Sequence, residues 1–241
     1  MELADLKTNK LDKQELLIDT TRLRVNRDAG SSVLFLTDGG RNRLVMLDKT
    51  KNEYTEIDQQ AINQLGAQMQ GAMAQMAQME AAMKNMPPEQ RAMMEKMMKG
   101  KMPTPQAAAS ATTTYTAKGS ATVNGFPCTK YDGDQAGSKV AEVCAAPLAA
   151  IRLSASDFQL FDKMREFMSG IQSAMKNSPF ASNASGFTER GFEGFPVQRI
   201  EFSNGQAVQR IDLKSADQTT FGDADFSLGN AKKMNLPEVR R

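Results

Sequence analysis

A stripe of methionines on one long predicted helix constrains the fold of this chain more than any other feature. Eleven of its 17 methionines fall between Met69 and Met102. From Ile62 to Met86, apolar residues recur at alternating steps of three and four, which is the period of one face of an α-helix. Because such a face is stable only when it is buried, the pattern predicts a helix over residues 58–85 that lies on another apolar surface.

A second methionine-rich helix is predicted over residues 89–99. Pro87 and Pro88 end the first helix, because proline cannot continue the hydrogen-bond ladder but fits the first turn of a new helix. Residues 101–113, which are rich in Pro, Ala, Ser and Thr, predict a flexible linker. We therefore expect a helical insertion over residues 58–100. The apolar face of its second helix consists of Met93, Met94, Met97 and Met98.

Short β-type runs dominate the remainder of the chain. Five runs within residues 14–57, separated by turns rich in Gly and Asp, predict an antiparallel meander. Further strands are expected over 114–119, 121–132 and 138–145, and over 195–228, where Ser203-Asn204-Gly205-Gln206 is a strong hairpin signal. The predicted fold class is α+β, with a curved antiparallel sheet and inserted methionine-rich lid helices in a single domain of residues 1–241.

A helix is also predicted over residues 154–176, within this series of strands. Ser154 and Asp157 form an approximate capping box at its start. Its apolar face follows heptad spacing and again favours methionine. The residues of this face are Phe161, Met164, Met168, Ile171 and Met175.

The two cysteines are spaced for a disulfide. The turn signal of residues 132–138 lies near their midpoint, so pairing centred on Ala136 would place Cys128 opposite Cys144. Directly opposed residues on antiparallel strands can bring their Cβ atoms within the range that a disulfide needs. The alternative is two reduced, buried cysteines. A Cys128–Cys144 disulfide would place the protein in an oxidising compartment.

Composition argues against several classes of function. The chain has 30 basic and 28 acidic residues and no block of like charge, so nothing indicates a nucleic-acid partner. Histidine is absent, which excludes His-dependent catalytic triads and His-based zinc sites. The acidic pairs Asp132/Asp134 and Asp223/Asp225 lie in Gly-containing turns, where they are ordinary turn formers. We expect no enzyme activity, no catalytic residue, no cofactor and no metal.

Two observations bear on cellular location. The longest uncharged run, residues 59–79, contains seven Gln and one Asn, so it predicts an amphipathic helix and no transmembrane segment. The first residues lack the basic start and apolar stretch of a secretory signal. The chain is therefore expected to be either cytosolic or a mature form whose signal peptide was removed.

The block Val123-Asn124-Gly125-Phe126-Pro127-Cys128-Thr129-Lys130-Tyr131, after a Met-rich helix and before a second strand at 140–144, is similar to one in exported bacterial proteins of unknown function. The order of about ten strands and inserted helices resembles the LolA/LolB-like fold of periplasmic lipoprotein carriers. The resemblance covers roughly residues 14–228. It implies a periplasmic half-barrel that holds acyl chains under helical lids, although no lipoprotein-handling residue carries over and the lipidated cysteine of LolB is absent.

Methionine suits an apolar surface that adapts to more than one shape, because its side chain is unbranched and polarisable. We therefore predict a groove between the sheet and the helices that binds a hydrophobic ligand: an acyl chain, a lipidated protein or an apolar segment. The candidate lining residues are Met69, Met73, Met76, Met79, Met83, Met93, Met97, Phe161, Met164 and Met168.

Three other readings of the methionine stripe stay open. The thioethers can simply fill a core between helix and sheet. Met-x-x-Met pairs at 73, 76 and 79 and at 83 and 86 can offer soft ligands to Cu(I), although a stripe spreads such ligands along a line. A passive scaffold or interaction domain would need neither ligand. The sequence gives no indication of the oligomeric state.

Overall fold

Twelve strands form one continuous open sheet in this protein. The computed structural model describes residues 1–28, 30–84, 112–175 and 191–235. The strands lie side by side in the order β12-β6-β5-β4-β3-β2-β1-β11-β10-β9-β8-β7. Neighbouring strands are antiparallel, except that β12 runs parallel to β6. The strands are β1 (Glu2–Asp5), β2 (Lys10–Ile18), β3 (Arg22–Arg27), β4 (Ser31–Asp38), β5 (Arg41–Asp48), β6 (Glu53–Asp58), β7 (Thr114–Val123), β8 (Phe126–Gln135), β9 (Ser138–Ala146), β10 (Phe195–Ser203), β11 (Gln206–Asp212) and β12 (Lys232–Met234).

The predicted antiparallel sheet is confirmed, and its strands number twelve instead of about ten. The five predicted strands of the meander are β2 to β6. Strand β1 was not predicted, because its four residues carry too short a pattern. It is placed by pairing with both β2 and β11, so that Leu3 lies between Asp12 and Ile211. A half-barrel like that of LolA stays a prediction.

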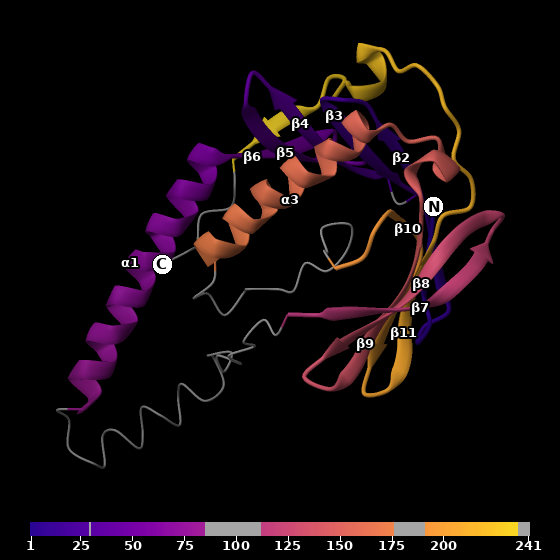
Figure 1. Ribbon diagram of the computed structural model, residues 1–241. Coiled ribbons are helices and arrows are strands. Elements are labelled where there is room, and N and C mark those ends of the chain that lie inside the picture. The colour runs from indigo at the N-terminus through magenta and orange to yellow at the C-terminus, as the bar shows by residue number, and fades with distance from the viewer. Residues whose placement is uncertain (29, 85–111, 176–190, 236–241) are drawn as a thin grey trace.

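Helix α3 (Ala155–Met175) lies in the hollow of the bent sheet, as Figure 1 shows. Its N-terminus is capped as predicted, because the Ser154 hydroxyl accepts a hydrogen bond from the Asp157 backbone N–H at 3.0 Å. Phe167 contacts Phe35 of β4, and Phe161 contacts Phe195 of β10, with 5.8 Å between ring centroids in each pair. The helix thus joins the two halves of the sheet in one apolar core.

Helix α1 (Gln59–Lys84) occupies the residues predicted for the first methionine-rich helix. It starts directly after β6, and the Asp58 carboxylate accepts a hydrogen bond from the Ala61 backbone N–H at 2.8 Å. Its buried Ile62 joins the core, and the helix contacts α3, β5 and β6. The predicted helix over 89–99 and the linker over 101–113 lie outside the described residues. No helix in the described part of the chain is long and apolar enough to cross a bilayer.

One predicted strand, residues 121–132, is wrong. Asn124 and Gly125 both have positive φ values, 50° and 86°, and form a tight turn that separates β7 from β8. Asn-Gly is the pair that favours such a turn, because both residues tolerate positive φ. Strand β7 in turn continues through residue 120, where a break was expected, with a bulge between Ala117 and Gly119.

The Cys128–Cys144 disulfide is confirmed, with 5.5 Å between the two Cα atoms. The register predicted for it is wrong, because Cys144 faces Lys130 across the β8–β9 pair. The turn residues are Ala136 and Gly137, and an irregularity between Gly133 and Asp134 shifts the pairing beyond them. The disulfide therefore joins residues diagonal to each other on the hairpin, inside the core cluster.

The segment after β11 covers the other face of the first half of the sheet. Residues 218–228, predicted as an extended strand, contain the 3-10 helix η2 (Asp223–Phe226) and no strand. Phe226 packs with Leu34 and Val45 in a second buried cluster. Tertiary contacts override strand propensity in this segment, because its Phe residues have an apolar sheet face to cover.

Two arginines of β3 hold this C-terminal segment. Arg24 is 7% exposed, and its NH1 group donates to the backbone carbonyls of Asp225 and Ser227, both at 2.9 Å. Burial lowers the pKa of the Arg24 guanidinium. The Arg22 guanidinium pairs with the Asp223 carboxylate at 2.7 Å and lies 4.3 Å from the centre of the Phe226 ring.

Replacing both cysteines by serine is expected to lower the free energy of unfolding by about 3 kcal/mol, because the disulfide restricts the unfolded chain. Urea denaturation followed by circular dichroism measures the difference. Wild-type protein treated with reductant is the matched control and is expected to lose a similar amount. An unchanged denaturation midpoint in both samples would contradict the prediction.

Arg24→Met is expected to release the C-terminal segment at a cost of about 2 kcal/mol, since two backbone carbonyls lose a charged donor. The variant should show a lower melting temperature and faster proteolysis within residues 213–231. Arg41→Met, at an exposed position of the β4–β5 turn, is the control. Equal proteolysis of the two variants would argue against this role of Arg24.

Candidate functional site

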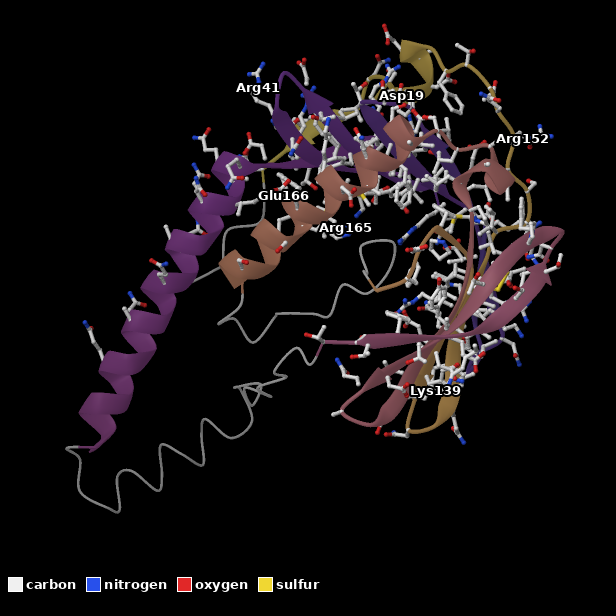
Figure 2. The ribbon with its side chains drawn as sticks, viewed as in Figure 1. Asp19, Arg41, Lys139, Arg152, Arg165 and Glu166 are labelled. Carbon is white, nitrogen blue, oxygen red and sulfur yellow. A yellow bond between two sulfur atoms is a disulfide. The ribbon has the colours of Figure 1, made fainter. Side chains whose placement is uncertain are left out.

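A cavity of about 460 Å³ lies between α3 and the segment that leads into β10. This size falls within the range of about 300–1,000 Å³ that is usual for ligand pockets. One wall is a single face of α3, made by residues at positions i, i+3, i+4 and i+7. The side chains of that wall are Phe158, Phe161, Asp162 and Arg165. Figure 2 shows Arg165 on the side of α3 toward β10 and Glu166 on a different side of the helix.

The opposite wall is formed by residues 191–196, which include Phe192 and Phe195. Phe192 is fixed by two tyrosines of the sheet, with ring centroids 5.1 Å from Tyr115 and 5.9 Å from Tyr131. The Tyr115 hydroxyl accepts a hydrogen bond from NH1 of Arg199 at 3.2 Å. Aromatic contacts and a buried polar bond thus hold this wall in one position.

Two glycines leave room for Tyr115. A Cβ added at Gly133 or at Gly191 would lie 2.7 or 2.8 Å from ring atoms of Tyr115, closer than real Cβ contacts. Gly194 is more restricted still. Its φ is +96°, and a Cβ there would overlap the carbonyl oxygen of Ala146 in β9. The wall can approach the sheet this closely only because these positions carry no side chain.

Charged groups on both walls belong to the cavity lining. NH1 of Arg165 pairs with the Asp162 carboxylate at 2.5 Å, and the Arg165 side chain is 18% exposed. The Nε atom of Arg165 is buried and has no hydrogen-bond partner. Glu193, on the other wall, is exposed. The site therefore combines two half-buried phenylalanine rings, Phe158 and Phe192, with polar and charged groups, and the rings of Phe161 and Phe195 lie buried behind them. Such a mixed lining is suited to an amphiphilic molecule.

The predicted groove residues lie in several places. Phe161 is buried and lines the cavity. Met164 and Met168 pack half-buried against the core and are not among the residues that line the cavity. Two further groups fall outside the description: the side chains of Met69, Met73, Met76, Met79 and Met83, whose backbone belongs to α1, and the whole of Met93 and Met97.

Sequence reasoning missed most of the cavity lining. Phe158 lies three residues before Phe161, so helical spacing places both on one face. Phe192 lies just before the predicted strands of residues 195–228, in a stretch for which no helix or strand was predicted, and Phe195 is the first residue of those strands. The alternation of Gly and Phe was the available signal, because glycine beside an aromatic residue marks a close approach of the backbone.

Among the described residues, no group of three or more His, Cys, Asp or Glu side chains is placed to hold a metal ion. The Met-x-x-Met pairs proposed as Cu(I) ligands have side chains outside the described part of the chain. The copper hypothesis thus stays a prediction.

Gly194→Ala is expected to destabilise the protein by at least about 1 kcal/mol, because alanine disfavours this φ and its Cβ meets backbone atoms that cannot rotate away. Thermal denaturation measures the change. Gly170→Ala is the matched control. Gly170 lies in α3 with open space around it, so alanine there should stabilise the helix slightly. Equal melting temperatures for the two variants would show that the close approach at Gly194 is unimportant.

Comparison with known proteins gives a family and no function. No curated protein and no solved structure matches the chain. A LolA-like fold and an exported bacterial origin therefore stay predictions. The model of a family described as a domain of unknown function, DUF4412, matches residues 36–230. This range begins within β4 and ends after η2, so it includes the disulfide, α3 and both walls of the cavity. Since the match spans well over half of the sequence, the chain belongs to the DUF4412 family.

Proposed function

We propose that this protein binds an apolar ligand, such as an acyl chain, in the cavity between α3 and residues 191–196, without catalysing a reaction. The observation that carries the proposal is the set of four phenylalanine side chains around a cavity of about 460 Å³. The ligand can be free, or it can be the acyl chain of a lipidated protein or an apolar polypeptide segment. Each of these offers the same aliphatic surface to the aromatic walls.

Burial of the ligand supplies the binding free energy. Each buried CH₂ group contributes about 0.8 kcal/mol, so a chain of about ten carbons contributes roughly 8 kcal/mol. Loss of translational and rotational freedom costs an amount of comparable size, so a preformed site is needed for useful affinity. The contacts of Phe192 with Tyr115 and Tyr131 preform one wall. The core contacts of Phe161 and Phe167 in α3 preform the other.

The proposed setting is an oxidising compartment such as the periplasm. The buried Cys128–Cys144 disulfide is compatible with an extracytoplasmic protein, because cytosolic thiols are kept reduced. The predicted role of the α1 methionines, an adaptable apolar surface for the ligand, belongs to the same proposal, and their side chains lie outside the described part of the chain. The thioether face would then suit chains of different length and branching.

The test is titration with N-phenyl-1-naphthylamine, whose fluorescence rises in apolar surroundings. Wild-type protein is expected to bind it saturably. Phe158→Glu should weaken binding at least tenfold, because a carboxylate replaces an aromatic ring in the lining. Leu11→Glu is the control. Leu11 is 53% exposed on β2 and does not line the cavity, so its replacement should leave binding unchanged.

Two results would contradict the proposal. One is the absence of saturable binding by folded wild-type protein. The other is equal affinity in the Phe158→Glu and Leu11→Glu variants, which would place the probe elsewhere. Native mass spectrometry of protein purified gently from cells gives independent support if it shows a bound lipid.

A further inference from the structure

We infer that the ligand carries a neutral oxygen acceptor at its head, such as an ester or amide carbonyl, and that Arg165 recognises it. This inference rests on the proposed function, since it assigns the polar part of the same cavity. The observation behind it is that Arg165 lies among aromatic side chains. Most of its N–H groups make no hydrogen bond in the part of the chain that the structure describes.

Arg165 has hydrogen-bond donors that it does not use within the described part of the chain. A guanidinium carries five N–H groups. Among the described residues only its NH1 group makes a hydrogen bond, to the Asp162 carboxylate, while Nε is buried and has no partner there. Nε has no exposed surface and so does not itself face the cavity. The Arg165 side chain lines that space, so its other unused N–H groups are the ones that can donate to a ligand oxygen.

The spacing along α3 matches a chain with a head and a tail. Phe158 and Phe161 precede Arg165 by seven and four residues on the same face. At a rise of about 1.5 Å per residue, Arg165 lies roughly 10 Å along the helix from Phe158. An acyl chain running along this face would place its carbons on the half-buried Phe158 ring and its carbonyl at the guanidinium.

The charges around Arg165 favour a neutral acceptor over a carboxylate. Asp162 pairs with the guanidinium at an ion-pair distance of 2.5 Å. Glu193 adds a second carboxylate to the lining. A free fatty acid would bring a further carboxylate to a lining that, among the described residues, already has two carboxylates and one cation, with repulsion that a partly apolar site screens poorly. An ester or amide carbonyl accepts the same hydrogen bonds without that repulsion.

The experiment measures displacement of N-phenyl-1-naphthylamine by methyl decanoate and by decanoate at neutral pH. For the wild type, methyl decanoate should bind at least tenfold more tightly than decanoate. Arg165→Met should weaken methyl decanoate at least tenfold, and by a larger factor than it weakens the probe, which lacks a carbonyl. Glu193→Gln should reduce the ratio between the affinities for methyl decanoate and decanoate, because it removes one negative charge from the lining. Arg41→Met, far from the cavity, is the matched control and should behave as wild type.

Probe binding by each variant shows whether the fold and the apolar site are intact. If Arg165→Met does not fold, Arg165→Lys replaces it, because lysine keeps the charge opposite Asp162 but lacks the unused N–H groups of the guanidinium. Equal ester affinity in wild type and variant would overturn the role of Arg165 and leave the apolar site standing. Tighter binding of decanoate than of its ester would overturn the neutral head group. If neither probe nor ester binds the wild type, the proposed function itself fails.

Discussion

The packing of α3 across the bend of the sheet is the contact on which the rest of the structure depends. Phe167 on one side of the helix contacts Phe35 of β4, and Phe161 contacts Phe195 of β10. These strands are five places apart in the sheet order. Strands β3, β2, β1 and β11 lie between them, so without the helix β4 and β10 would be linked only through the sheet. One amphipathic helix therefore sets both the core and the position of the cavity.

The cavity follows from a conflict between two requirements at the start of β10. Phe195 and Val197 need burial in the core, while the backbone just before them crosses close to Ala146. Gly194 allows that crossing, and Phe192 packs on Tyr115 and Tyr131 of the sheet. Phe195 contacts Phe161 of α3, and the cavity lies between the helix and the residues just before that contact. The close approach of the backbone to Ala146 at Gly194 therefore accounts for both the fixed wall and the cavity beside it.

The two faces of the first half of the sheet are covered in different ways. Helices α1 and α3 cover one face, and the other is covered by the C-terminal segment that Arg22 and Arg24 hold. This explains why strands such as β4 and β5 are apolar on both faces. The cavity described above lies on the α3 side of the sheet.

The sequence by itself determined the elements whose signals are local. Alternating apolar residues set strands β2 to β6, heptad spacing and the Ser154 cap set α3, and two cysteines near one turn indicated the disulfide. Only the tertiary structure decided what depends on distant partners. It placed β1 between β2 and β11, and it packed residues 218–228 on an apolar face of the sheet. It also brought Arg165 and Phe192 into the lining of one cavity. Such contacts join residues far apart in the chain, and no local periodicity encodes them.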